Sequence, residues 1–475
     1  MSALDDRDAA VYWHPCSHFA DLREVPPFEV IGAEGARLHL PEGRSVLDAI
    51  SSWWCKALGH RHPGLGRAVR DQLDRFEHVI AANTTHGLLV SVCERVLAAA
   101  NGLPVAAWGR EAKPGRPPGP YGKVFLADNG STAVEVAVKM ALQAQAQRGQ
   151  PQRKSFVALE NGYHGETVAT LALGDCGLYG QPYEALYFPV EKLGPLPYRR
   201  GTHDPAWQDG AAAADAVIAQ LAPRVGELAA IVYEPILQAA GGMRFYSPDF
   251  LARLCAWAKA HDVFLIADEI ASGWGRLGTM LATHLVTGLP AAGAASVLWP
   301  DFVAVSKGLT AGFSPLSAVL TRDDIAALFD GPFDAGRSFL HSNTYTGHAL
   351  GLAAASATLD AFDEERVLEG VKLRADLLAR ELNEAAGARP WMRGLRHLGL
   401  VAAFDLTAVD GTPLDPARRT GRRVQQEAFR RGVFLRPLGD TLYLFPPLNV
   451  GLTELEEMIA GLLGAADAIL TDRRK

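Results

Sequence analysis

The stretch Val303-Ala-Val-Ser-Lys-Gly-Leu309 places a lysine directly after a short apolar run and directly before a glycine. Residues 302–305 are apolar throughout, as in a strand that is buried on both faces of a sheet. An amine at the end of such a strand is poorly solvated, which lowers its affinity for a proton and leaves a neutral nucleophile for imine formation. A lysine that extends from the strand end into solvent is an equally good interpretation of this motif taken alone.

Outward from this stretch, four more short apolar runs predict strands at residues 123–127, 155–159, 230–233 and 263–267. Apolar residues then recur at helical spacing between Val134 and Leu142, so a helix is expected directly after the first of these strands. Strands that are apolar on both faces and separated by helical stretches predict an α/β fold, with a large, mainly parallel central sheet flanked by helices.

The C-terminal part has a different pattern, with helices expected at residues 367–385 and 416–431 and strands at residues 398–406 and 433–445. Together with the N-terminal segment, it is expected to form a smaller α+β domain. The predicted division is residues 1–75 for the N-terminal segment of the small domain, 76–345 for the large domain and 346–475 for the C-terminal part of the small domain.

A second motif, Ala127-Asp-Asn-Gly-Ser-Thr132, comes directly after a predicted strand and directly before a predicted helix. Thr132 and Glu135 have the spacing of a capping box. The free N–H groups at the start of such a helix bind phosphate well, so Gly130 and Ser131 are candidate phosphate ligands. A plain capped helix is the favoured interpretation of this motif alone.

A third motif, Leu265-Ile-Ala-Asp-Glu269, puts an acidic pair at the carboxyl end of a predicted strand, where open α/β sheets bind ligands. A structural ion pair explains it equally well. An anion site, a carboxylate and a lysine, each after a strand, can meet at one edge of the sheet, and pyridoxal phosphate requires these three groups. Tyr163, in Asn161-Gly-Tyr-His-Gly165, is expected to stack on the pyridine ring of that cofactor.

The composition narrows the class of protein further. The 46 basic and 53 acidic residues give a formal charge of −7, which argues against nucleic-acid binding. Five scattered cysteines show neither a disulfide framework nor metal-ligand spacing and favour a reducing, cytoplasmic location. The acidic N-terminus does not resemble a signal peptide, and residues 277–300 are too interrupted to span a membrane. Residues 104–120 and 288–296, rich in Gly, Pro and Ala, are expected to be loop insertions.

From about residue 11 to about residue 467, the chain resembles the class III aminotransferases of fold type I. The residues that carry this resemblance are Trp13-His-Pro, Ser51-Ser-Trp-Trp54, Ala127-Asp-Asn-Gly-Ser131, Gly162-Tyr-His-Gly-Glu166, Glu234-Pro, Gly241-Gly-Met-Arg244, Ala267-Asp-Glu-Ile270, Gly273-Trp-Gly-Arg276, Ser306-Lys-Gly-Leu-Thr310, His341-Ser-Asn-Thr-Tyr345 and Leu435-Arg-Pro-Leu-Gly439. The resemblance implies an enzyme with pyridoxal 5'-phosphate as cofactor, no metal, and a homodimer with shared active sites.

The resemblance also implies a role for each site residue. Catalysis is assigned to Lys307, which binds the cofactor as a Schiff base and moves the proton, to Asp268 at the pyridine nitrogen, and to Tyr163 on the ring. The other cofactor contacts are Gly130 and Ser131 at the phosphate, Ile270 on the second face of the ring, and Thr344 from the partner subunit. The substrate pocket is assigned to Trp53, Tyr163, Lys307, Ser342, Arg436 and Tyr443, with the Arg436 guanidinium on the substrate carboxylate.

Within the class, the tryptophan pair and Arg436 resemble the biotin-synthesis branch, which transfers an amino group, commonly from S-adenosyl-L-methionine, to 8-amino-7-oxononanoate. Cys16 departs from the tyrosine common near the amino donor, so the donor stays open between adenosylmethionine, lysine and others. Two rival interpretations remain. One is an aminotransferase of the same class that acts on ω-amines with pyruvate or 2-oxoglutarate. The other is a cofactor-binding regulator, which would need an added DNA-binding segment.

Overall fold

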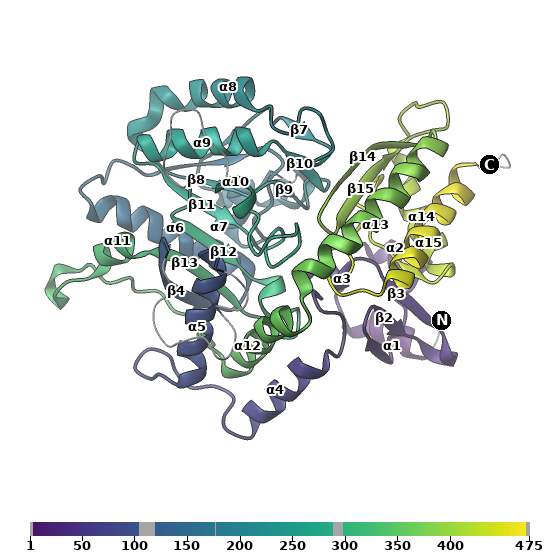
Figure 1. The fold of residues 1–475 in the computed structure, drawn as a ribbon, viewed down its shortest axis with the longest axis horizontal. Coiled ribbons are helices and arrows are strands. Elements are labelled where there is room, and N and C mark those ends of the chain that lie inside the picture. Colours follow the sequence, from purple (N-terminus) through teal and green to yellow (C-terminus); the bar gives the residue numbers. More distant parts are fainter. Residues whose placement is uncertain (1–2, 104–118, 176, 288–297, 472–475) are drawn as a thin grey trace.

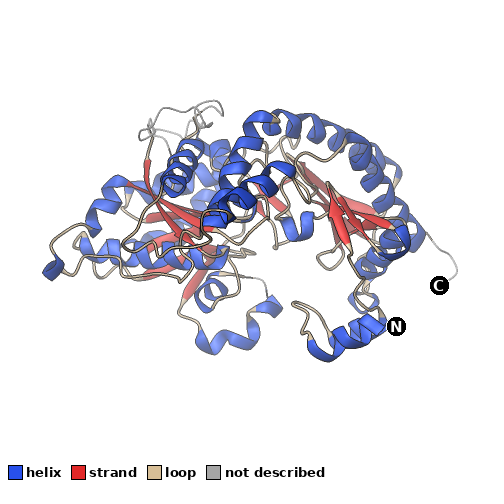
Figure 2. Ribbon diagram, turned by 90° about the horizontal axis from the view of Figure 1, so that it is seen from below, coloured by secondary structure: helices blue, strands red, loops and turns tan. Residues whose placement is uncertain are grey.

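The structure is a computed structural model, and it describes residues 3–103, 119–175, 177–287 and 298–471. Most of the predicted insertions at 104–120 and 288–296 therefore lie outside the described residues. Figure 1 shows two lobes, a large one built on a central sheet and a small one that holds both ends of the chain, and Figure 2 shows the same pair from below. In the described part of the chain, no helix has the length and apolar composition needed to cross a membrane.

The large lobe is built on a seven-stranded sheet in the order β4-β13-β12-β11-β8-β5-β6. Its strands are β4 (Tyr121–Ala127), β5 (Ser155–Leu159), β6 (Val190–Leu193), β8 (Leu228–Tyr233), β11 (Phe264–Asp268), β12 (Phe302–Val305) and β13 (Ser317–Arg322). All pairs are parallel except the two made by β13, which runs antiparallel to both β12 and β4. The prediction of a mainly parallel central sheet is confirmed, and the five predicted strands are β4, β5, β8, β11 and β12.

Alternating side chains of these strands divide the core into two layers, because successive residues of a strand point to opposite faces. On β11 and β12, Ile266 and Ala304 belong to the layer that also contains the buried face of α6 (Gly130–Gln147), while Leu265 and Val303 belong to the main core cluster. Both sets are completely buried, which explains why the strands have no polar face in the sequence. The helix predicted after β4 is α6.

The remaining helices and strands of the large lobe surround this sheet: α5 (Gly87–Ala100), α7 (Val168–Leu173), β7 (Tyr198–Arg199), α8 (Ala211–Leu221), β9 (Leu237–Gln238), β10 (Arg244–Tyr246), α9 (Pro248–Ala260), α10 (His284–Thr287) and α11 (Asp323–Ala326). The short strands β7, β10 and β9 form a separate antiparallel sheet in that order. Figure 1 shows α8 and α9 together on one side of this lobe.

The small lobe combines the two ends of the chain. Its N-terminal elements are α1 (Ala3–Val11), α2 (Phe19–Glu24), β1 (Gly32–Glu34), β2 (Arg37–His39), β3 (Ser45–Asp48) and α3 (Ser51–Trp54). Its C-terminal elements are α13 (Val367–Ala388), β14 (Met392–Leu398), β15 (Val401–Leu406), α14 (Thr420–Arg430), β16 (Val433–Phe434), β17 (Thr441–Leu444) and α15 (Leu452–Leu470). Parallel pairing of β16 with β3 joins the two ends.

Two helices connect the lobes: α4 (Pro63–Leu73) packs against α12 (Ala349–Glu364), and α12 also contacts α5 and α13. The domain limits at residues 75 and 345 stay a prediction from the sequence.

Three expectations for the small lobe were wrong in detail. Residues 398–406 are not one strand, because β14 ends at Leu398 and β15 begins at Val401. Gly399, with φ of +55°, makes the hairpin turn between them. Residues 433–445 contain two short strands, β16 and β17, separated by a loop that holds Arg436. The helix expected at 416–431 is broken at Arg419, whose φ of +47° ends a short 3-10 turn before α14 begins.

Candidate active site

The site lies where strands of the large sheet end. Since β4, β8, β11 and β12 run in the same direction, the residues that follow them meet at one edge of the sheet. Gly130 follows β4, Glu234 follows β8, Asp268 ends β11 and Lys307 follows β12. The structure therefore brings the three motifs singled out in the sequence to one place.

Lys307 begins a short 3-10 turn, Lys307–Thr310, and its φ of +31° is unusual for a residue other than glycine. Burial lowers the pKa of its amine, and the nearby carboxylates of Asp268 and Glu234 oppose this shift only in part. A buried amine with a lowered pKa is the form of lysine that acts as a nucleophile or a base near neutral pH. Its Nζ lies 5.4 Å from the centroid of the Trp54 ring.

Asp268 is held by two hydrogen bonds at the end of β11. Its Oδ2 lies 2.8 Å from Nδ1 of the buried His164, and its Oδ1 accepts from the backbone N–H of Ile270 at 3.1 Å. The carboxylate is thus fixed in one orientation by neighbours on both oxygens. Nε2 of His164 is buried and has no hydrogen-bond partner among the described residues.

A second buried carboxylate, Glu234, lies close to this pair. It accepts hydrogen bonds from the backbone N–H groups of Tyr163 at 3.0 Å and Ala239 at 3.2 Å. Burial, followed by the repulsion of the Asp268 carboxylate, raises the pKa of Glu234 to about 8. Asp268 and Glu234 are therefore two carboxyl groups whose surroundings differ, and Glu234 holds its proton more tightly than an ordinary glutamate.

The helix start at α6 differs from the predicted capping box. The N-cap is Asn129, whose side chain accepts from the backbone N–H of Thr132 at 3.1 Å. Glu135 instead accepts from the backbone N–H of Ala169 at 3.3 Å. Thr132 and Glu135 have the right spacing, but a better capping residue stands three positions before Thr132. The backbone N–H groups of Gly130 and Ser131 have no intrahelical partner, as expected for the first turn of a helix.

Two glycines let the backbone close around this helix start. A Cβ at Gly130 would lie 2.9 Å from Cδ1 of Ile270, and a Cβ at Gly165 would lie 2.1 Å from Oγ of Ser131. Gly165 also has a φ of +124°, which other residues rarely adopt. The loop that carries Tyr163 therefore approaches the start of α6 more closely than any other residue type would allow.

One wall of the site is the short left-handed turn α3. Ser51, Ser52, Trp53 and Trp54 have φ values of +50°, +44°, +72° and +71°. A left-handed conformation costs a residue other than glycine about 1–2 kcal/mol, so four in succession require strong support from their surroundings. Trp54 is buried and donates its indole N–H to the hydroxyl of Tyr443 at 3.2 Å. Trp53, by contrast, stays 39% exposed.

Arg436 lies on the exposed tryptophan. Its guanidinium carbon is 4.5 Å from the centroid of the Trp53 ring, and its Nη2 donates to the backbone carbonyl of Cys16 at 3.0 Å. No ion pair with a carboxylate is found for Arg436 within the described ranges. A half-buried guanidinium with unused N–H groups is well suited to a ligand carboxylate.

The side chain of Tyr163 contacts an acidic residue, Glu166. Its hydroxyl donates to Oε1 of Glu166 at 3.0 Å, and Sγ of Cys16 lies 4.0 Å from the same oxygen. Burial, together with the carboxylate of Glu166, raises the pKa of the Cys16 thiol. Cys16 is therefore a neutral thiol placed between an acidic and a basic side chain.

Two predicted site residues are not brought to this cluster within one chain. Ser342 and Thr344 are exposed in the segment before α12, and none of the hydrogen bonds found among the described residues joins either of them to Lys307 or Asp268.

The class III aminotransferase family model matches residues 20–465. The chain belongs to the class III aminotransferases. It is 37% identical to an adenosylmethionine-8-amino-7-oxononanoate aminotransferase of Synechococcus elongatus, over 96% of this chain and 98% of that protein. The solved structure of the Methanocaldococcus jannaschii protein of the same name gives a TM-score of 0.86 at 26% identity, and 98% of each chain is covered. An amine transaminase from an uncultivated Pseudomonas species, solved in its PLP-bound form, gives 0.82 at 29% identity, with 97% of this chain and 99% of that chain covered.

This membership makes the chain a transaminase of fold type I with pyridoxal phosphate as its cofactor. The residues present fit that group. The aminotransferase offers a partly buried lysine whose amine has a lowered pKa, an oriented carboxylate on Asp268 and the open first turn of an 18-residue helix for a phosphate. When bound, the cofactor supplies an electron sink that stabilises a carbanion.

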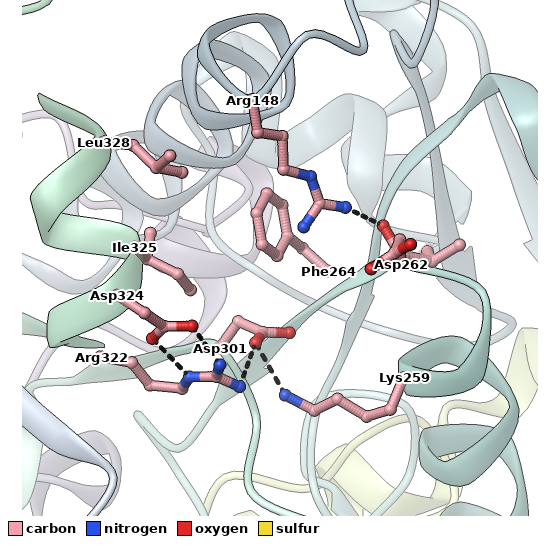
Figure 3. Close-up of a pocket in the computed structure, with 10 residues that line it drawn as sticks. Arg148, Lys259, Asp262, Phe264, Asp301, Arg322, Asp324, Ile325 and Leu328 are labelled. Atoms are coloured by element: carbon pink, nitrogen blue, oxygen red, sulfur yellow. Dashed lines mark hydrogen bonds and ion pairs between the residues drawn. The ribbon is translucent and has the colours of Figure 1, made fainter.

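A cavity of about 260 Å³ lies at the opposite edge of the sheet, before β11 and β12 (Figure 3). Asp301 lies between two cations there, accepting from Lys259 Nζ at 2.7 Å and Arg322 Nη1 at 3.2 Å, while its other oxygen accepts from the backbone N–H of Leu265. Arg148 stacks on Phe264 at 4.3 Å. The lining contains three basic and three acidic residues, so their charges balance. Because Asp301 joins Lys259 of α9 to Arg322 of β13, we interpret this cluster of the aminotransferase as structural.

Sequence reasoning gave no role to several residues of the site. Trp54, His164 and Glu166 belong to motifs in which only Trp53 and Tyr163 were predicted to have a role, and the motif Glu234-Pro carried the family resemblance without a predicted role. For Glu234, an acidic residue directly after a strand of the central sheet is the same signal that pointed to Asp268.

Proposed function

We propose that this aminotransferase converts 8-amino-7-oxononanoate to 7,8-diaminononanoate in biotin biosynthesis, with S-adenosyl-L-methionine as amino donor. The observation that carries this proposal is Arg436, a half-buried cation on the face of Trp53, which belongs to the same short turn as Trp54, whose ring centroid lies 5.4 Å from Nζ of Lys307. A long-chain keto acid needs a cation for its carboxylate at one end and a lysine at the carbonyl end. The names of the relatives give the same substrate.

The roles of the side chains follow from their surroundings. Asp268, held by His164 and the backbone of Ile270, is proposed to keep a bound pyridine nitrogen protonated. Gly130 and Ser131 present free N–H groups to a phosphate. Tyr163 and Ile270 are proposed to cover the two faces of the ring. Such fixed electrostatic contacts usually contribute most of the catalytic effect.

Proton transfer is assigned to Lys307. Its buried amine has a lowered pKa, so Nζ accepts the α-proton of the amino donor and returns it on the other side of the reaction. Trp54 covers Nζ on one side and excludes water from the amine. Trp53, Tyr443 and Ser342 are proposed to line the passage of the substrate chain towards Arg436.

We also propose a homodimer with shared active sites. The segment before α12 exposes large apolar side chains, with Phe333 and Leu340 101% and 91% exposed and Tyr345 58% exposed. Exposed apolar groups of this size on one segment are typical of a contact surface. Thr344 lies in the same segment, so a second subunit would bring it to the phosphate. A cytoplasmic location is also proposed, because the scattered cysteines favour a reducing compartment.

The test is an assay of the purified, cofactor-loaded protein with either 8-amino-7-oxononanoate or pyruvate as acceptor and with a panel of donors: adenosylmethionine, lysine and simple amines. Formation of 7,8-diaminononanoate with adenosylmethionine supports the proposal. Formation of the same product with lysine alone corrects the donor. Transfer from simple amines to pyruvate, with no diamine product, would place the chain in the amine branch instead.

A further inference from the structure

We propose that Asp48 is a positioning residue for the substrate pocket. Its buried carboxylate holds the turn Ser51–Trp54 in the left-handed conformation that places Trp53 under Arg436 and Trp54 beside Lys307. The support that Asp48 gives to the turn is argued from the structure alone, whereas the identity of the substrate whose binding it affects rests on the proposed function.

The carboxylate of Asp48 is completely buried at the end of β3 and is used on both oxygens. Oδ1 accepts from the backbone N–H of Ser52 at 3.0 Å, and Oδ2 accepts from the hydroxyl of Ser52 at 2.7 Å. Nε2 of His60 lies 2.9 Å from Oδ2. Burial alone would raise the pKa of Asp48, but the hydrogen bonds from His60 and Ser52 outweigh it and lower the pKa. The group that accepts the hydrogen bonds of Ser52 is therefore an ionised carboxylate.

The partners of Asp48 are themselves fixed. The backbone of His60 exchanges hydrogen bonds with that of Gly35, at 2.7 and 3.1 Å, which ties the imidazole to the sheet of the small lobe. Ser51 donates its hydroxyl to the carbonyl of Phe445 at 2.7 Å, and Trp54 donates to Tyr443. The turn is thus held at its start, at its centre and at its end, and Asp48 supplies the contacts at the centre.

The strand register explains how this support reaches the substrate side. Asp48 pairs with Phe434 in the parallel ladder of β3 and β16, so the two strands end side by side. The turn leaves β3 at the same edge from which the loop with Arg436 leaves β16. Trp53 and Arg436 are therefore neighbours because Asp48 fixes the direction of the first loop. If φ at Ser52 and Trp53 were negative, the chain would turn the other way and the Trp53 indole would no longer lie against the Arg436 guanidinium.

The experiment compares Asp48→Ala and Asp48→Asn holoenzymes with the wild type. We expect the KM for 8-amino-7-oxononanoate to rise roughly tenfold in Asp48→Ala, equal to about 1.4 kcal/mol of binding free energy. We expect a smaller change in kcat and in cofactor absorbance, because Trp54 keeps its own hydrogen bond to Tyr443 beside Lys307. Asp48→Asn, which keeps one acceptor oxygen, should show a smaller rise and serves if the alanine variant does not fold. Asp301→Asn is the matched control, a buried aspartate at the far edge of the sheet that should lower stability without raising KM.

Rescue separates positioning from a general loss of stability. Glycine adopts positive φ at little cost, so Ser52→Gly should return the KM of Asp48→Ala towards the wild-type value, whereas Ser52→Ala should not. Failure of this rescue, or an unchanged KM in a folded Asp48→Ala enzyme, overturns the proposal. If the wild type makes no diamine, the proposed function fails instead. The inference is then decided by a crystal structure of Asp48→Asn or Asp48→Ala: it holds if φ at Ser52 or Trp53 has changed sign in either variant and is overturned if both keep the left-handed turn.

Discussion

The guanidinium carbon of Arg436 lies 4.5 Å from the centroid of the Trp53 ring, so the cation rests on an aromatic face at the substrate side of the site. Stacking on an aromatic ring fixes the plane of a guanidinium, and the N–H groups at its edge remain available for a carboxylate. The two residues are far apart in the sequence, yet they form one surface, which we propose binds the terminal carboxylate of the substrate chain.

Arg436→Ala should raise the KM for 8-amino-7-oxononanoate by roughly 10–100-fold, because a hydrogen bond to a charged group contributes about 1.5–3 kcal/mol. Arg436→Lys should recover only part of this, since an ammonium group cannot make two parallel hydrogen bonds. Steady-state kinetics with the keto acid varied gives the answer. The control is Arg430→Ala, an exposed arginine of α14, which should behave as the wild type. An Arg436→Ala enzyme with unaltered KM would remove the carboxylate role.

Trp53→Ala should raise the same KM by a smaller factor, because a cation–π contact contributes about 0.5–2 kcal/mol. Trp53→Phe keeps an aromatic face and should lie between alanine and the wild type. In the double variant with Arg436→Ala, the effects should not add, since each substitution removes the same contact. Additive effects would show that Trp53 and Arg436 act independently.

Lys307→Ala should lower kcat by at least about 100-fold, the least that a positioned acid–base group contributes. The variant should also lose the covalent link to the cofactor, so that borohydride reduction no longer adds cofactor mass to the protein. Lys259→Ala is the control, a lysine of α9 that pairs with Asp301 far from the site. Near-normal turnover by Lys307→Ala would mean that another amine performs the chemistry.

The sequence allowed the central sheet and the Lys307–Asp268 edge to be predicted because buried parallel strands are short, apolar runs, and ligands bind where they end. The antiparallel strand β13 was missed, since Ser317–Arg322 begins with a serine and ends with a threonine and an arginine although five of its six residues are buried. The strand at 398–406 was placed too early because an apolar run passes through the hairpin turn at Gly399 without interruption.

The pocket wall could not be predicted from local sequence. Ser51–Trp54 contains no glycine, so nothing in it indicates positive φ, and its conformation depends on Asp48 and on Phe445 from the other end of the chain. The prediction of the α6 N-cap was wrong for a related reason. Both Asn129 and Thr132 are capping residues by type, and only the structure shows that the helix begins after Asn129. Residues expected to contact the cofactor, such as Lys307 and Asp268, were therefore easier to predict than a residue such as Asp48, which supports the conformation of its neighbours.

Gly165→Ala should weaken cofactor binding by about tenfold or more, because the new Cβ would lie 2.1 Å from Oγ of Ser131 at a φ of +124°. The helix start at Ser131 must then move, and with it the phosphate ligands. Reconstitution of the cofactor-free protein, followed by absorbance, measures the dissociation constant. Pyridoxal, which lacks the phosphate, should bind both proteins alike. An equal loss for pyridoxal would show that the substitution damages the whole site.

Glu234 makes the stability of the cofactor-free protein depend on pH. Burial, then repulsion by Asp268, raises the pKa of Glu234 to about 8, whereas an ordinary glutamate in the unfolded chain has a pKa of about 4.3. Between these values the folded protein keeps a proton that the unfolded chain releases. The contribution of Glu234 is therefore fully present below about pH 4, is lost as the pH rises towards 8, and changes no further above it.

Glu234→Gln removes this titration, since glutamine stays neutral at every pH. Urea unfolding at pH 5, 6, 7, 8 and 9 should show the wild type losing stability relative to the variant by up to about 1.4 kcal/mol per pH unit, with the difference becoming constant above about pH 8. Glu456→Gln, an exposed glutamate of α15, should run parallel to the wild type throughout. Parallel curves for Glu234→Gln as well would mean that Glu234 is ionised in the folded protein and that its pKa is not raised by burial.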